Sequence, residues 1–180
     1  MRPYRSALYI PASNARAMEK AQTLGADAII FDLEDAVAPA EKSAARQTLI
    51  TALQADYGGR ARIVRINGAD TIWGRDDVAA FGNHPKVDAI LLPKINAPQD
   101  LDIAATRPLW AMMETAQGML NAPMIAAHPA LHGMVMGTND LAREMNSRFR
   151  SDRLALQTGL GLCVLAARAY GRVILDGVYN

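Results

Sequence analysis

The chain has 180 residues, enough for one domain with a sizeable core. Its apolar fraction of 51% and charged fraction of 21% are typical of a folded globular protein and exclude a disordered or collagen-like chain. Nineteen basic and eighteen acidic residues leave a net charge of +1 without a Lys/Arg block, so we expect no nucleic-acid partner.

The N-terminal apolar stretch is too short for a signal peptide, and Pro11 interrupts it. No later segment reaches the roughly 18 consecutive apolar residues that a membrane span needs. We therefore expect a cytoplasmic protein without a membrane partner. Cys163, the single cysteine, cannot form an intrachain disulfide, and its apolar surroundings predict an inert buried thiol.

Short β-rich runs alternate with Ala-rich segments of helical spacing along the whole chain. The predicted strands are residues 6–11, 27–35, 62–67, 87–94, 109–115, 133–140 and 172–179, and helical segments include 14–25, 40–54 and 152–171. Parallel strands joined by helices predict an α/β fold, either an open doubly wound sheet or a closed (β/α) barrel. No repeat, linker or composition shift divides the chain, so we expect a single domain over residues 1–180.

Charged residues follow six of the seven predicted strands. In chain order they are Asp32, Glu34 and Asp35, then Arg65, Lys94, Glu114, Asp140 and Asp176. The carboxyl ends of parallel strands form one face, where ligands bind, so these side chains are expected to converge. Alternatively, each acid caps a helix, pairs with a basic neighbour or meets solvent. The acids at 32–35 need an Arg, a Lys or a metal ion nearby unless water solvates them fully.

Three of these residues suggest a particular chemistry. Glu114 and Asp140 supply oxygen ligands of the kind that Mg²⁺ prefers, and they leave further positions for water or substrate. Arg65 offers a planar set of donors to a carboxylate or to an oxygen that gains negative charge. A metal ion and an arginine on one face suit enolate chemistry, such as cleavage of a C–C bond beside a thioester or ketone.

Taken together and in order, several motifs resemble the citrate lyase β-subunit-like branch of the HpcH/HpaI aldolase superfamily. They are RSALYIPASNARAMEKA, GADAIIFDLEDAVAPAEKSAAR, RIN, LLPKI, MMETAQGM and GTNDLARE, with AARAYGRVILDGVYN at the end. The resemblance covers nearly the whole chain. The combination of DLEDAV, MMETAQG and GTNDLA is highly specific, whereas any one of them alone is not.

The resemblance implies a TIM-type (β/α)8 barrel that binds Mg²⁺. It also implies cleavage or formation of a C–C bond in a 3-hydroxyacyl-CoA of the citryl, citramalyl or malyl type. Such a lyase splits its substrate into a 2-oxo acid and a short acyl-CoA, and the expected assembly is a homo-oligomer, a trimer or a hexamer. The family continues through an eighth strand and C-terminal helices, so we expect a barrel truncated after its seventh strand.

The motifs also imply roles for single residues. Glu114 in MMETA and Asp140 in GTNDLA resemble metal ligands, with Glu114 also in contact with substrate. Arg65 in RIN resembles a catalytic residue that binds substrate and stabilises the enolate. Glu34 and Asp35 in DLEDAV belong to a catalytic segment, near either the water shell of the metal or basic partners. The resemblance assigns neither of them as general base.

Weaker candidates come from two other motifs. Gly137 and Thr138 in GTND are expected to contact substrate. Arg16 and Lys20 in PASNARAMEKA, which is similar to the CoA-side entrance in the family, are expected to contact phosphate groups.

Two alternative functions stay open. The first is a class II aldolase acting on 4-hydroxy-2-oxo acids, although DLEDAV favours the acyl-CoA lyase. The second is a catalytically silent subunit that binds CoA esters or oxo acids. It is motivated by the expected truncation, because lyases of this type take a catalytic acid from the C-terminal segment.

Overall fold

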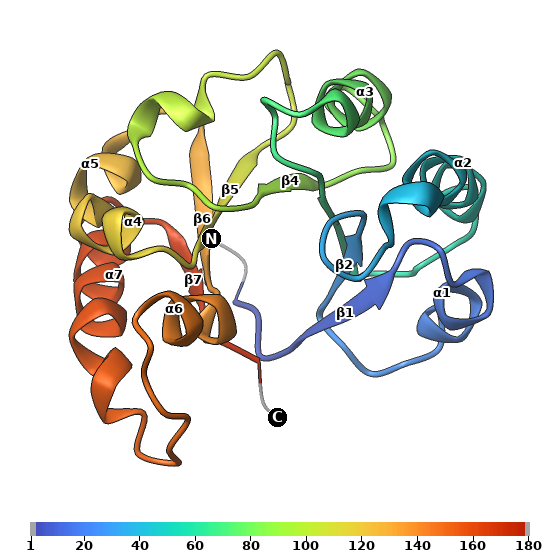
Figure 1. Ribbon diagram of the computed structural model, residues 1–180. Coiled ribbons are helices and arrows are strands. Elements are labelled where there is room, and N and C mark those ends of the chain that lie inside the picture. Colours follow the sequence, from blue (N-terminus) through green and yellow to red (C-terminus); the bar gives the residue numbers. More distant parts are fainter. Residues whose placement is uncertain (1–2, 179–180) are drawn as a thin grey trace. The chain divides into compact units, whose positions relative to one another are not determined.

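The computed structural model describes residues 3–178 (Figure 1). The last predicted strand included Tyr179 and the last quoted motif ended at Asn180, and both residues lie outside this range. Strands and helices alternate along the described chain, which confirms the predicted α/β class. Within residues 3–178, no helix has the length and apolar character needed to cross a membrane.

The described residues form two compact units. The N-terminal unit comprises residues 3–91 with 103–108, and the C-terminal unit comprises residues 92–102 with 109–178. The single domain expected over residues 1–180 stays a prediction.

Four parallel strands in sequence order build the sheet of the N-terminal unit. They are β1 (Ala7–Pro11), β2 (Ala28–Asp32), β3 (Ala61–Arg65) and β4 (Ala89–Leu92), whose last residue belongs to the C-terminal unit. The connecting helices are α1 (Ala15–Ala21), α2 (Lys42–Ala52), which follows the 3-10 turn η1 (Pro39–Glu41), and α3 (Ile72–Phe81) (Figure 1). Each helix therefore joins two neighbouring parallel strands, as the sequence predicts.

Polar side chains cap two of these helices. Asn14 accepts a hydrogen bond from the Ala17 N–H at the start of α1, and Thr71 accepts one from the Gly74 N–H at the start of α3. A cap of this kind stabilises a helix by about 1 kcal/mol. These caps fix the residue at which each helix begins and therefore the length of the loop between that helix and the preceding strand.

Strand β2 is buried along its whole length. The Phe31 ring meets Tyr57 edge to face with centroids 5.3 Å apart, and the Tyr57 hydroxyl lies 3.5 Å from the Met18 carbonyl of α1. Phe31 therefore points toward the helices. Because successive side chains of a strand point to opposite faces, Ile30 and Asp32 point to the other face of the sheet.

Three parallel strands, β5 (Leu109–Met113), β6 (Leu131–Met136) and β7 (Val173–Leu175), pair in that order in the C-terminal unit. Its helices are α4 (Ala116–Leu120), α5 (Ala122–Ala127), α6 (Thr138–Glu144) and α7 (Gln157–Ala169), with 3-10 turns η2 (Pro98–Leu101) and η3 (Leu154–Leu156) (Figure 1). Helix α7 packs against α4 and α5. All seven predicted strands are thus present.

The boundary of one strand differs from the prediction in a way that affects the site. The sequence predicts a single strand over residues 133–140, but β6 runs from Leu131 to Met136 and α6 begins at Thr138. Asp140 lies in the first turn of α6 and not at a strand end. Acidic residues favour this position because the N-terminus of a helix carries a partial positive charge.

Cys163 on α7 is fully buried, and its Sγ lies 3.2 Å from the Met119 Sδ. Burial raises the pKa of the Cys163 thiol to about 12, because the thiolate is poorly solvated there. The buried thiol expected from the sequence is confirmed.

We expect native Cys163 to resist the thiol reagent DTNB at mildly alkaline pH, because the reactive thiolate is both scarce and inaccessible. The same residue should react fully once guanidinium chloride unfolds the chain. The absorbance of the released thionitrobenzoate measures both rates. Equal rates in the native and unfolded protein would contradict the buried position.

Candidate active site

Strand register brings an acid and a base together at the ends of β2 and β3. Asp32 and Arg65 are direct partners in the parallel pairing. Arg65 Nε and Nη2 donate to the two carboxylate oxygens of Asp32 at 2.7 and 2.5 Å. Asp32 is 2% exposed and Arg65 is 7% exposed. This two-point ion pair fixes the plane of the guanidinium as well as its position.

The same guanidinium contacts the other two acids of the DLED segment. Arg65 Nη1 lies 3.1 Å from Glu34 Oε2 and 3.8 Å from Asp35 Oδ2. Glu34 is buried, whereas the Asp35 side chain is 55% exposed. The structure therefore places Glu34 and Asp35 beside a basic partner, one of the two arrangements that the sequence left open.

The environment of Arg65 keeps it charged. Burial disfavours the cation, but hydrogen bonds to Asp32 and attraction to Asp32 and Glu34 outweigh burial and raise the pKa of Arg65. The Tyr9 ring lies 5.5 Å from the Arg65 Cζ and gives the cation an aromatic face. Asp32 and Glu34 engage three of the N–H donors of Arg65, which leaves others for a carboxylate or an oxyanion.

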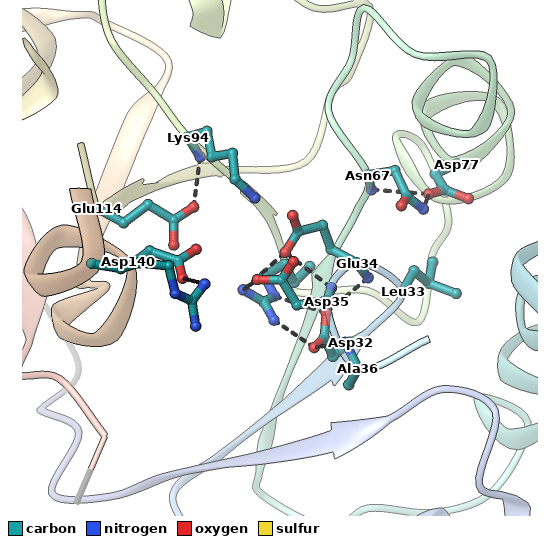
Figure 2. Close-up of polar contacts among 12 residues, drawn as sticks. Asp32, Leu33, Glu34, Asp35, Ala36, Asn67, Asp77, Lys94, Glu114 and Asp140 are labelled. Carbon is teal, nitrogen blue, oxygen red and sulfur yellow. Dashed lines mark hydrogen bonds and ion pairs between the residues drawn. The ribbon is translucent and has the colours of Figure 1, made fainter. Parts of the chain in front are cut away.

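Asp32 also shapes the loop after β2. Its Oδ1 accepts the Glu34 N–H at 2.9 Å, and its Oδ2 accepts the Ala36 N–H at 3.2 Å (Figure 2). One buried carboxylate therefore orients both the loop and the guanidinium.

Sequence reasoning missed a second group of buried polar side chains, which lies next to the loop that follows Asp32. Lys42 donates to the carbonyls of Leu33 and Glu34, and Arg46 donates to Asp77, which also accepts two hydrogen bonds from Asn67. The sequence held one usable signal. The buried stripe of α2 is Lys42, Ala45, Arg46 and Leu49, so two cations occupy core-facing positions of an amphipathic helix.

In the C-terminal unit, Glu114 follows β5 and is only 2% exposed. Its Oε1 accepts the Lys94 N–H at 2.8 Å (Figure 2). A Cβ on Gly137 would lie 2.3 Å from the Glu114 Cβ, so this position requires glycine. Gly137, expected to contact substrate, therefore makes room for the Glu114 side chain.

Asp140 lies near Glu114 because Gly137 contacts Glu114 and caps α6, which carries Asp140 in its first turn (Figure 2). Asp140 Oδ1 lies 3.1 Å from Arg143 Nη1. The Arg143 side chain is 81% exposed, so this ion pair is weak.

The segment that orients Glu114 is itself held in place. A Cβ on Gly118 would lie 2.2 Å from the Ile95 carbonyl oxygen, so α4 and the segment around Ile95 approach closely. Asn96 accepts hydrogen bonds from Thr115 at 2.6 Å and from Asn121 at 2.8 Å. These contacts fix the main chain that presents the Lys94 N–H.

The donor chemistry of Glu114 and Asp140 fits a hard divalent cation. Carboxylate oxygens suit Mg²⁺, which keeps water or substrate in its remaining positions. No cluster of three or more His, Cys, Asp or Glu side chains suited to a metal occurs among residues 3–178.

The other candidate residues lie in different surroundings. Thr138 is buried in the first turn of α6. It packs against Gly177, because a Cβ on Gly177 would lie 2.4 Å from the Thr138 hydroxyl oxygen. Arg16 and Lys20 are exposed on α1. Their expected contacts with substrate and phosphate stay predictions.

The predicted site residues divide between the two units. Arg65 and the acids at 32–35 belong to the N-terminal unit, and Glu114 and Asp140 belong to the C-terminal unit. The approach of Arg65 to the two expected metal ligands stays a prediction.

Comparison with known proteins gives one family and several relatives. Residues 5–180 match the family described as HpcH/HpaI aldolase/citrate lyase. The chain is 67% identical over 183 residues to a (3S)-malyl-CoA thioesterase of Cereibacter sphaeroides, covering 99% of this chain and 64% of that protein. It is 35% identical over 162 residues to an L-malyl-CoA/beta-methylmalyl-CoA lyase of the same species, covering 80% of this chain and 51% of the lyase.

A solved structure extends this similarity to the fold. The citrate lyase beta subunit from M. tuberculosis, complexed with oxaloacetate and magnesium, matches with a TM-score of 0.84 and 32% identity. The match covers 96% of this chain and 78% of that chain. With the alternating parallel strands and helices, it confirms the predicted TIM-type α/β barrel class, and seven strands of this class occur within residues 3–178.

We expect Asp32→Asn to lower the free energy of unfolding by about 3 kcal/mol, because it leaves the buried Arg65 cation with a weaker partner. Asp88→Asn is the matched control. Asp88 binds Arg62 in a similar pair, but its side chain is 45% exposed, so the loss should stay below about 1 kcal/mol. Urea unfolding followed by circular dichroism measures both losses, and equal losses would contradict the special role of Asp32.

Proposed function

The chain belongs to the HpcH/HpaI aldolase/citrate lyase family, and from this premise we propose that it acts on a malyl-CoA-type thioester with Mg²⁺ held by Glu114 and Asp140. The observation that carries the substrate class is the 67% identity to a (3S)-malyl-CoA thioesterase over 99% of the chain. Hydrolysis of the thioester bond is the proposed reaction, and C–C cleavage of the same substrate is the second candidate.

When bound, Mg²⁺ supplies positive charge beside substrate oxygens and favours their deprotonated or developing anionic forms. Glu114 is already oriented for this role by the Lys94 N–H. Asp140 would exchange its exposed partner Arg143 for the ion. An exposed pair of this kind contributes at most about 1 kcal/mol, so the exchange costs little.

In the proposed hydrolysis, a water oxygen bonds to the thioester carbonyl carbon and loses its proton. The C–S bond then breaks, and CoA leaves as a thiol after taking up a proton. Negative charge develops on the carbonyl oxygen. Arg65 is the cation proposed to stabilise this charge, because Asp32 holds the guanidinium in one orientation. Glu34 and Asp35, next to Arg65, are the candidates for handling the protons.

C–C cleavage is supported by the 35% identity to a malyl-CoA lyase and by the motifs that the sequence shares with citrate lyase β subunits. This reaction removes the hydroxyl proton, breaks the bond to the neighbouring carbon, and gives a 2-oxo acid and an acyl-CoA enolate that takes up a proton. The enolate charge rests on the same thioester oxygen. Arg65 therefore has the same proposed role in both reactions.

Product assays with (3S)-malyl-CoA and Mg²⁺ separate the two reactions. Hydrolysis releases free CoA thiol without a 2-oxo acid, whereas C–C cleavage releases a 2-oxo acid without thiol. We expect thiol release, and Arg65→Met should lower it by about 10²-fold or more. Asp88→Asn should match the parent. The buried Cys163 should add no background in a DTNB assay.

Two other outcomes would overturn the proposal. Cleavage of only a CoA-free 4-hydroxy-2-oxo acid would indicate the aldolase. Binding of malyl-CoA without any product would indicate a silent subunit.

We expect Mg²⁺ with oxaloacetate to raise the melting temperature, since a ligand at about 100 times its Kd stabilises the folded state by about 2.7 kcal/mol. The double variant Glu114→Gln and Asp140→Asn should lose this rise, because both expected ligands become neutral. Asp102→Asn, an exposed acid of the same unit, should keep it. A double variant that responds like the parent would show that the metal binds elsewhere.

A further inference from the structure

Helix α2 carries two cations on its buried face. Lys42 and Arg46 lie one turn apart, and they are 6% and 7% exposed. Removing a cation from water is unfavourable unless the surrounding groups compensate for the lost solvation. The contacts of Lys42 and Arg46 therefore show which groups compensate for the solvation that the two cations lose.

Lys42 contacts main-chain oxygens. Its Nζ donates to the carbonyls of Leu33 and Glu34, both at 3.0 Å, and lies 5.5 Å from the centre of the Trp73 ring. Burial lowers the pKa of Lys42, and attraction to Glu34 and Asp32 opposes this shift. The ammonium thus fixes the peptide groups that follow Asp32 and leaves the acids in contact with Arg65.

Arg46 acts on the loop after β3 through the fully buried carboxylate of Asp77. It donates to Asp77 Oδ1 at 2.8 Å. Asp77 Oδ2 accepts the main-chain N–H of Asn67 at 3.0 Å and its side-chain amide at 2.7 Å (Figure 2). Asn67 lies two residues after Arg65 in the chain.

The start of α3 packs tightly on the same segment. A Cβ on Gly74 would lie 1.9 Å from the Gly68 carbonyl oxygen, so the main chains nearly touch. Helix α3 therefore holds the loop after β3 in two ways, through the Asp77 side chain and through its own main chain at Gly74.

We infer that α2 sets the orientation of Arg65, and that Lys42 is a positioning residue for the reaction. Lys42 fixes the carbonyls of Leu33 and Glu34, and the main chain fixed in this way directs the carboxylates that hold the guanidinium. Arg46 and Asp77 fix the segment that continues from Arg65. The inference rests on the proposed function for the role of Arg65 in the reaction, but the contacts themselves lie within the N-terminal unit.

Three substitutions of Lys42 test this inference. Lys42→Met keeps the length of the side chain but removes its donors, Lys42→Arg keeps the charge and donors, and Lys42→Gln keeps a single shorter donor group. Lys86→Met is the matched control, because Lys86 is an exposed lysine of the same unit.

The first measurement does not depend on turnover. In protein labelled with ¹⁵N-arginine, the Arg65 Nε–H resonance is assigned by its absence in Arg65→Lys. We expect Lys42→Met to shift or broaden this resonance, because the carboxylates of Asp32 and Glu34 lose their fixed directions. Lys42→Arg should stay near the parent position, and Lys86→Met should be unchanged.

The second measurement separates kcat from KM with (3S)-malyl-CoA. A misdirected Arg65 should lower kcat by about 10²-fold in Lys42→Met, since errors of about 1 Å in a catalytic group have effects of this size. Lys42→Arg should recover most of kcat. The Mg²⁺ concentration for half-maximal rate should not change, because the proposed metal ligands belong to the other unit.

The outcomes keep the inference and the proposed function apart. If the parent turns over no thioester but Lys42→Met alone moves the Arg65 resonance, the positioning holds and the proposed function fails. A folded Lys42→Met variant with the parent resonance and the parent kcat would overturn the inference. If Lys42→Met does not fold, Lys42→Gln decides between the same two outcomes.

Discussion

The buried ion pair between Asp32 and Arg65 is the interaction on which the N-terminal part of the site depends. The parallel register of β2 and β3 makes the two residues neighbours, and two N–H donors of Arg65 bind the two carboxylate oxygens of Asp32. A buried pair of this kind adds little net stability, but loss of one partner leaves an unsolvated charge. The pair therefore selects one arrangement of the loop after β2, whose N–H groups bind the same carboxylate.

The sequence predicted the parts of the fold that depend on local pattern, and the structure confirms seven strands separated by helical segments. The sequence predicts Asp140 at a strand end, but Asp140 lies in a helix. The apolar run before it gives no sign that β6 ends at Met136 and that Gly137 caps α6. Lys42 and Arg46 were missed because charged residues on a helix usually face water. Only the tertiary packing shows that carbonyls and a buried carboxylate compensate for them.

Hydrolysis and C–C cleavage of a malyl-CoA-type ester differ in the bond that breaks, but both place negative charge on the thioester oxygen. One fixed guanidinium beside carboxylates can therefore belong to either kind of enzyme. The chain is similar both to a thioesterase, at 67% identity, and to a lyase, at 35% identity, and the role proposed for Arg65 is the same for either reaction. The discriminating step is proton handling: an attacking water must lose its proton in one case, and a substrate hydroxyl must lose it in the other.

Gly137 adds a constraint that charge alone does not reveal. The space beside its α-carbon is already filled by the Glu114 side chain, so any larger residue there would push against a carboxylate that the Lys94 N–H holds in place. A single methyl group at position 137 would therefore displace the Glu114 side chain while every acid and every base stays in the chain. On the proposal that Glu114 holds the metal ion, a homologue that keeps all the charged motif residues but has lost this glycine is predicted to have lost the metal site.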